Sequence, residues 1–167
     1  MTNHMQGTGQ AVAILARRGV AAQAQLCAKS IAGTHNAGTH WGVKVMNLDE
    51  VRTFCLAQPA AIESLPFGPG ALVYKVMNKM FALLPEEVKP GETPFVVFKA
   101  EPHLGQLLRD NWPAVTPAWH FNKQHWNSVE MDGSVPDDEV RAWIEHSYAL
   151  VVRGLTRAQR ASLQDAT

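Results

Sequence analysis

Polar and apolar positions follow a helical period from Met46 onward, and the period has a clear starting signal. Asn47 can cap the amides of a first helical turn, and Glu50, three residues later, can complete a capping box. The apolar stripe of this helix consists of Leu48, Val51, Phe54 and Cys55. We expect the helix to end near Gln58, before Pro59.

The apolar segments that follow have the composition of strands. A cluster of proline and glycine over 66–70 predicts an irregular approach to the sheet. Residues 71–76 and 79–84 are rich in Val, Leu, Tyr and Phe and predict a hairpin around Met77-Asn78, and residues 94–99 supply a third strand.

The register of this hairpin has a chemical consequence. A two-residue turn places Tyr74 opposite Phe81 and Lys75 opposite Met80, whereas a three-residue turn with a left-handed residue places Lys75 opposite Lys79. Like charges that face each other destabilise a sheet unless an anion joins them, so the second register would favour a phosphate site. The sequence leaves both registers open.

The second half of the domain predicts more helix than strand. The expected elements are a short helix over 101–110, an extended segment over 114–119, a strand over 127–131 and a long helix from Pro136 to about Gly154. Proline suits the first turn of a helix, and Asp137, Asp138 and Glu139 complement the dipole of the long helix. A final short helix can be capped by Thr156. This order of elements is typical of an α+β fold rather than of alternating βαβ units.

Charge divides the chain into two regions. Residues 1–45 contain four basic and no acidic residues, a net charge of +4, while residues 46–167 contain eleven basic and fifteen acidic residues, a net charge of −4. We interpret residues 1–45 as an N-terminal extension, poorly ordered or partly helical over 10–32, or as a start placed upstream of Met46; a functional tail is the alternative. Residues 46–167 form the predicted domain.

Composition indicates a cytoplasmic protein without covalent crosslinks. Two cysteines, Cys27 and Cys55, have no CxxC or Cys/His ligand spacing, so both thiols are expected to be free in a reducing compartment. No apolar run approaches the roughly 20 residues of a membrane span. A chain of 167 residues suits a single domain, and we expect a monomer.

Several segments carry a resemblance to a known family. They are Asn122-Lys123-Gln124-His125-Trp126-Asn127, Gly133–Glu139, Ser147–Val151 and, upstream, Met46–Val51, Lys75-Val76, Lys79–Ala82 and Thr116-Pro117. Over roughly residues 46–160 the chain resembles the MmcQ/YjbR family of small bacterial proteins. The resemblance implies a frataxin/CyaY-like fold, in which two helices pack on one antiparallel sheet, and it implies DNA binding.

Nucleic-acid binding has a plausible set of side chains. The candidates are Lys75, Lys79, Asn122, Lys123, His125 and Trp126. A cation can hold a phosphate while tryptophan offers a stacking face or a wedge between base steps. The −4 charge of the domain opposes this hypothesis, because non-specific affinity for duplex DNA comes mainly from neutralising phosphates.

Each candidate also has a structural interpretation. Trp126 can be a partly buried ring that anchors the turn against the long helix, and His125 can hydrogen-bond to loop backbone. Lys123 can be a solvated charge, and Asn122 can be a turn former. The alternative function is therefore a protein or small-molecule interaction module that uses the Lys123/His125/Trp126 turn and the 71–84 hairpin.

Metal binding and catalysis have weaker signals. His120 and His125 are five residues apart, which is a poor spacing for shared ligands on a helix. His125 with Ser128 or Cys55 would give a base and a nucleophile, but no nucleophile elbow, phosphate loop or orienting residue accompanies them. We therefore predict a protein that is not an enzyme and that needs no metal or cofactor.

Overall fold

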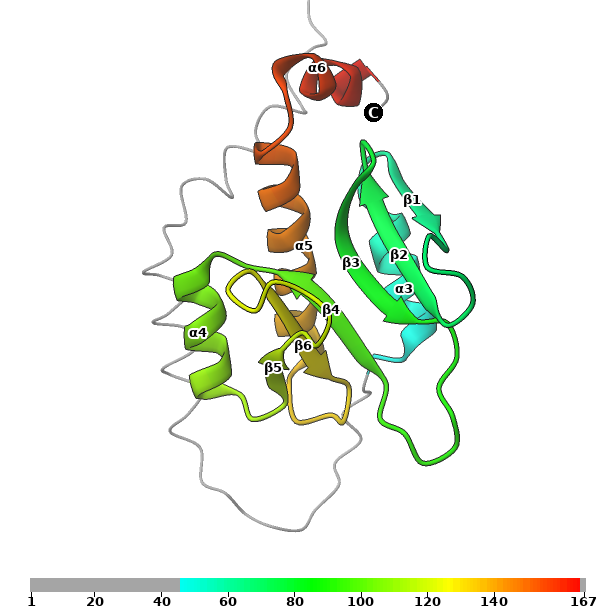
Figure 1. The fold of residues 1–167 in the computed structure, drawn as a ribbon, viewed down its shortest axis with the longest axis vertical. Coiled ribbons are helices and arrows are strands. Elements are labelled where there is room, and N and C mark those ends of the chain that lie inside the picture. The colour runs from blue at the N-terminus through cyan, green and yellow to red at the C-terminus, as the bar shows by residue number, and fades with distance from the viewer. Residues whose placement is uncertain (1–45, 166–167) are drawn as a thin grey trace, which may run out of the picture. The chain divides into compact units, whose positions relative to one another are not determined.

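One antiparallel sheet organises residues 46–165, the part of the chain that the computed structural model describes (Figure 1). The helices are α3 (Leu48–Leu56), α4 (Pro102–Asn111), α5 (Asp137–Arg153) and α6 (Arg157–Asp165). The strands are β1 (Ala61–Ser64), β2 (Ala71–Val76), β3 (Lys79–Pro85), β4 (Phe95–Lys99), β5 (Val115–Pro117) and β6 (Trp126–Glu130), in the order β1-β2-β3-β4-β6-β5. The predicted α+β class is confirmed. Our interpretation of residues 1–45 lies outside the described residues.

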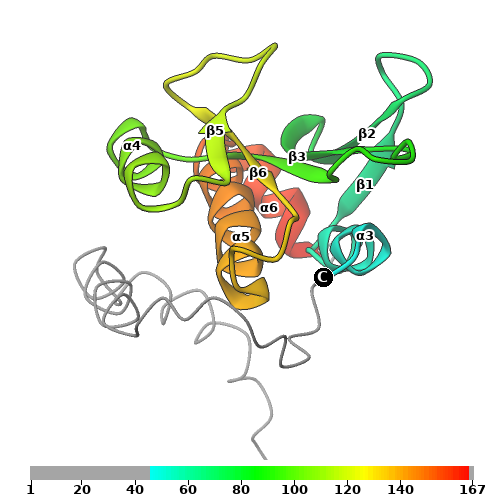
Figure 2. The same ribbon diagram turned by 90° about the horizontal axis from the view of Figure 1, so that it is seen from below.

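The two faces of the sheet differ in what covers them. Figure 2 shows α3 and α5 against one face, while the β1–β2 loop and the β5–β6 loop rise from the other. In the same view α4 lies beside the β5 edge. The domain thus has a helix-covered face and an open face, and no helix within residues 46–165 is long and apolar enough to cross a membrane.

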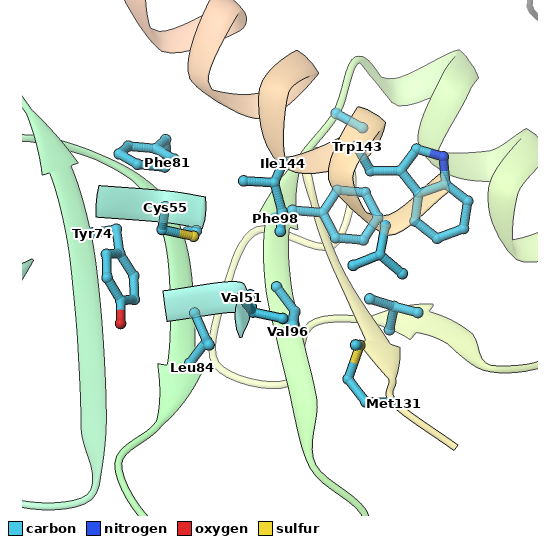
Figure 3. Close-up of a cluster of buried hydrophobic side chains, with 14 of the residues drawn as sticks. Val51, Cys55, Tyr74, Phe81, Leu84, Val96, Phe98, Met131, Trp143 and Ile144 are labelled. Carbon is cyan, nitrogen blue, oxygen red and sulfur yellow. The ribbon is translucent and has the colours of Figure 1, made fainter. Parts of the chain in front are cut away.

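The main hydrophobic core fills the space between the sheet and the helices (Figure 3). Phe98 of β4 stacks on Trp143 of α5 with their ring centroids 5.4 Å apart, and Phe81 of β3 meets Tyr148 edge to face at the same distance. Fully burying one such side chain stabilises a fold by about 1.5–3 kcal/mol. The sheet and α5 therefore form the rigid frame on which the loops are held.

Helices α3 and α5 both start as the sequence predicts. The Asn47 side chain accepts a hydrogen bond from the Glu50 amide at 2.9 Å, and the Glu50 carboxylate accepts one from the Asn47 amide at 3.0 Å, which completes the capping box. Helix α5 follows Pro136, and its Asp137 carboxylate accepts a hydrogen bond from the Met46 amide at 2.8 Å. The first described residue is thereby tied to the start of the last long helix.

The hairpin adopts the two-residue turn. Met77 and Asn78 have φ values of 47° and 61°, as a type I′ turn requires, and Lys75 lies opposite Met80. The three-residue register, with Lys75 opposite Lys79, is therefore wrong. The predicted pairing of Tyr74 with Phe81 is also wrong, because a bulge places Tyr74 opposite Ala82.

Strand β1 was not predicted from the sequence. Its residue Glu63 lies opposite Tyr74 of β2 and accepts a hydrogen bond from the Tyr74 hydroxyl at 2.8 Å. Arg52 of α3 donates to the other Glu63 oxygen at 2.6 Å, so a polar chain links α3, β1 and β2. Burial, followed by the bond to Glu63, raises the pKa of the Tyr74 hydroxyl well above its ordinary value. β1 is therefore an edge strand that is fixed by its side chains.

Candidate nucleic-acid interface

Strands β3 and β4 pair directly over only part of their length. They pair at Ala82↔Phe98 and Leu83↔Val97, and the next backbone groups do not bond directly. Instead the Ser147 hydroxyl of α5 accepts a hydrogen bond from the Lys99 amide at 2.8 Å and donates one to the Phe81 carbonyl at 2.5 Å. A fully buried side chain thus occupies the place of a strand-to-strand hydrogen bond.

The separation of the strands opens a crevice of about 330 Å³. Its lining consists of Lys79 and Met80 of β3, Lys99 of β4, Trp126 of β6, and Leu150, Val151 and Gly154 at the end of α5. The structure therefore brings together Lys79 and Trp126, two of the residues that the sequence suggested. It adds Lys99, which sequence reasoning missed.

Trp126 forms one wall of this crevice. It lies directly opposite Lys99 in the β4–β6 pairing, and the Lys99 ammonium lies 6.0 Å from the centre of its ring. The ring packs with Phe121, at 5.3 Å between centroids, and with the apolar cluster on the open face of the sheet. Trp126 is half-buried, so it is held in place while part of its surface stays accessible.

The turn before Trp126 is built by Asn122. The Asn122 side chain accepts a hydrogen bond from the Gln124 amide at 3.0 Å, and its carbonyl accepts from the amides of His125 and Trp126 at 3.0 and 2.9 Å. The turn-forming interpretation of Asn122 therefore describes its contacts. The half-buried His125 accepts a bond from the Ala100 amide through its carbonyl at 2.8 Å, which joins the turn to the end of β4.

Arg109 of α4 also holds this turn. Arg109 donates to the side chain of the fully buried Asn127 and, at 3.5 Å, to the carbonyl of the exposed Lys123. Gly105 makes room for this contact, because a Cβ there would lie 3.0 Å from the Asn127 amide nitrogen. No local motif in the sequence indicated this link, which depends on the docking of α4 against β6.

The remaining sequence candidate, Lys75, lies near the crevice without lining it. It lies on β2 opposite Met80, and it is half-buried on the open face. The sequence candidates therefore lie in three places. Lys79 and Trp126 line the crevice, Lys123 and His125 lie in the turn before Trp126, and Lys75 lies on the neighbouring strand.

Charge is unevenly distributed over the domain. The strand ends that carry Lys79 and Lys99, together with Arg153 at the end of α5 and Arg157 and Arg160 of α6, form what we call the basic end. Glu101, an acidic neighbour of this end, is paired with Arg153 at 2.6 Å and with His146 at 2.5 Å.

The opposite ends of the same elements form the acidic end. These residues are Asp49 and Glu50 in the first turn of α3, Glu86 and Glu87 after β3, Glu130 at the end of β6, and Asp137, Asp138 and Glu139 in the first turn of α5. Figure 1 shows α5 running along the domain, with α6 beyond its last turn and the tip of the β2–β3 hairpin level with that turn. The net charge of −4 for residues 46–167 therefore conceals two ends of opposite sign.

Two aromatic side chains protrude beside the open face. Trp119, in the β5–β6 loop, is 80% exposed, and Phe67, in the β1–β2 loop, is 69% exposed. Both loops rise on the same side of the sheet (Figure 2). Exposed aromatic rings on the rim of an open face are typical of binding surfaces.

Cys55, one of the two nucleophiles that the sequence suggested, is buried on α3 rather than placed in this site. Within residues 46–165 no group of three or more His, Cys, Asp or Glu side chains could hold a metal ion. Burial, with a smaller effect of Glu63, raises the pKa of the Cys55 thiol to about 12. Cys55 is therefore protonated at neutral pH and is a poor nucleophile.

Comparison with known proteins identifies a matching family model, related sequences and similar solved structures. The YjbR family model matches residues 56–150. YjbR of Escherichia coli K12 is 35% identical over 118 residues, 71% of this chain and 98% of the relative, and YbdF of Escherichia coli O157:H7 is 35% identical over 92 residues, 55% and 73%. The crystal structure of DR2400 of Deinococcus radiodurans is 33% identical with a TM-score of 0.65, covering 72% of this chain and 89% of that one. A Pseudomonas syringae structure is 25% identical with a TM-score of 0.55, covering 63% and 98%.

Proposed function

Because the chain belongs to the YjbR family, whose two Escherichia coli members named above are uncharacterised, we propose its function from the site: it binds DNA, without catalysis, through the basic end. The observation that carries the proposal is the meeting of Lys79, Lys99 and Trp126 around one crevice. Lysines hold phosphates and an aromatic ring offers a stacking face. The position of α3 and α5 on one face of the sheet supports a frataxin/CyaY-like architecture as part of this proposal.

The charge distribution removes the main objection to DNA binding. Lys99 and Phe95 lie at opposite ends of β4, and Phe95 is paired with Glu130. Four strand steps separate these ends by roughly 13 Å. At physiological ionic strength the Debye length is about 8 Å, so the acidic end is largely screened from a phosphate at the basic end. The local charge at the crevice, rather than the total, determines the interaction.

A charge-reversal pair tests the proposal. Lys99→Glu changes the crevice, whereas Lys89→Glu makes the same change at an exposed residue of the loop between β3 and β4. We expect Lys99→Glu to weaken binding of a fluorescein-labelled DNA about tenfold at low salt and to reduce the slope of log K against log salt by about one, because a phosphate contact is lost. Lys89→Glu should change the affinity less than about twofold, since it makes no phosphate contact.

Two results would contradict the proposal. Equal losses for both variants would mean that only net charge matters, and no binding by the native chain at low salt would remove the DNA-binding function. Circular dichroism of both variants establishes that they are folded. Lys79→Glu provides a second crevice variant, and we expect it to behave like Lys99→Glu because it lines the same crevice.

The exposure of Phe67 and Trp119 favours a second candidate function. Two protruding rings beside an open sheet face suit a protein or small-molecule partner that is recognised by apolar contact. This function predicts binding that is insensitive to salt and is lost in a Trp119→Ser, Phe67→Ser double variant. If DNA binding is absent and an apolar dye binds the native chain but not the double variant, the interaction module is the better description.

A further inference from the structure

We infer that the crevice between β3 and β4 takes one unpaired nucleotide, with the base stacked on Trp126 and the phosphate held by Lys79 and Lys99. The inference rests on the proposed function and narrows it, because it makes single-stranded DNA, or a base extruded from a duplex, the preferred ligand. Three properties of the crevice support it: its preformed opening, its size and the chemistry of its walls.

The opening is part of the backbone architecture. Paired strands lie about 4.8 Å apart, which leaves no room for a ligand between them. Here the Ser147 hydroxyl lies between the Lys99 amide and the Phe81 carbonyl and bonds to both, so both backbone groups are satisfied while the strands stay apart. The crevice therefore exists before any ligand arrives, and binding does not have to break strand pairing.

The size of the crevice selects small ligands. Its volume of about 330 Å³ lies at the lower end of the range for small-molecule sites. A single base with its sugar and phosphate is of this order, whereas a stacked base pair cannot enter between two strands. Duplex DNA can meet the lysines only at the mouth of the crevice.

The walls of the crevice suit a ligand that combines a flat ring with an anionic group. Met80, Leu150 and Val151 give apolar surface, Trp126 gives an aromatic face, and two ammonium groups complete the lining. The Lys99 ammonium lies 6.0 Å from the centre of the Trp126 ring. A base that stacks on the ring replaces this cation–π contact, and the ammonium then pairs with the phosphate of the same nucleotide.

The end of α5 does not repel that phosphate. Free carbonyl groups at a helix C-terminus carry partial negative charge. In this domain the Gly154 amide bonds to the carbonyls of Leu150 and Val151, and Arg160 donates to the carbonyls of Arg153 and Leu155 at 3.0 and 2.9 Å. The carbonyl end of the helix is thus capped and neutralised beside the crevice.

The first experiment compares single- and double-stranded ligands with the full-length chain. Fluorescence anisotropy with a 12-nucleotide oligo-dT and with the corresponding dT·dA duplex gives both affinities at the same salt concentration. We expect the single strand to bind at least about tenfold more tightly. Trp126→Leu should weaken single-strand binding about tenfold, a loss within the range of one base–aromatic stack, and should change duplex binding less than about twofold.

A second variant blocks the crevice without touching its lysines or its tryptophan. A Cβ at Gly154 would meet only the carbonyl oxygens of Val151 and Leu150, at 3.5 and 3.6 Å, which are ordinary contacts. Gly154 can therefore take a larger side chain. Ala149→Leu, at an exposed position of α5 that does not line the crevice, is the control, and we expect it to leave binding unchanged. Gly154→Leu adds a side chain at the crevice wall and should lower single-strand affinity about tenfold while leaving duplex affinity within about twofold.

The possible results separate this inference from the function on which it rests. Equal affinity for single and double strands, or single-strand binding that Trp126→Leu and Gly154→Leu leave unchanged, overturns the nucleotide site. If Lys99→Glu still weakens binding in that case, the proposed DNA-binding function stands. No binding of either ligand overturns both.

Discussion

Replacing Ser147 by alanine removes the hydroxyl that joins β3 to β4 beyond their last directly paired residues. The substitution is small and lies on the buried side of α5, so it leaves the apolar core in place. Its effect falls on two backbone groups, the Lys99 amide and the Phe81 carbonyl. In the native domain each of them has the Ser147 hydroxyl as its partner.

The expected loss of stability follows from those two groups. A buried donor or acceptor that loses its partner costs roughly 1–3 kcal/mol. Alanine has a higher helix propensity than serine, which offsets about 0.5 kcal/mol. We take the lower end of this range for each of the two groups. The free energy of unfolding should therefore fall by about 1.5 kcal/mol.

Urea unfolding followed by tryptophan fluorescence measures this loss. With an m-value of about 2 kcal/mol/M, the midpoint should fall by about 0.75 M. Ser162→Ala is the matched control, because it makes the same change at an exposed position of α6 and should alter stability by less than about 0.5 kcal/mol. A Ser147→Ala domain as stable as the native one, with a Lys99 amide still protected from hydrogen exchange, would show that the strands can pair directly and would refute the reasoning.

Three further predictions concern polar groups of the frame. Tyr74→Phe removes a hydrogen bond to the Glu63 carboxylate and should lower the free energy of unfolding by about 1.5–3 kcal/mol in urea titrations; an unchanged midpoint would contradict it. In a Cys27→Ser background the Cys55 thiol, with its pKa raised by burial to about 12, should react with a thiol reagent at pH 8 only after unfolding, and rapid labelling of the native domain would argue against its burial. Burial alone would raise the pKa of Glu101, but the hydrogen bonds to Arg153 and His146 lower that pKa overall. The ionised carboxylate therefore stabilises the fold above pH 4.5, the ordinary pKa of the group, and this stabilisation is lost as the pH falls below 4.5. The difference in melting temperature between the native protein and Glu101→Gln should accordingly shrink between pH 7 and pH 3, whereas a constant difference would exclude this role.

The parts of the fold that the sequence predicts well are those specified by neighbouring residues. The capping box of Asn47 and Glu50 spans four positions, and the start of α5 after Pro136 depends on proline geometry and three adjacent acids. The hairpin is specified by two β-rich segments and a short turn. In each case the determining interaction lies within a few residues along the chain, so pattern alone identifies it.

The missed features depend on contacts between distant segments. Residues 61–64 are too few to show a strand period, and they become a strand through pairing with β2 and through the bond between Glu63 and Tyr74. Lys99 was overlooked because only the order of the strands brings it beside Trp126 and Lys79. The open crevice depends on the Ser147 hydroxyl of α5. In the sequence, nothing distinguishes Ser147 from the other buried positions of the helix.

The two oppositely charged ends of the described domain also affect how molecules behave toward one another. At 0.01 M ionic strength electrostatic attraction extends about 30 Å, so the basic end of one molecule attracts the acidic end of the next. Such a head-to-tail contact uses two different surfaces and does not close on itself, which favours open chains of molecules in concentrated, salt-poor solution. A polyanion that occupies the basic end competes with this contact. DNA should therefore disperse the protein under conditions in which the protein alone associates.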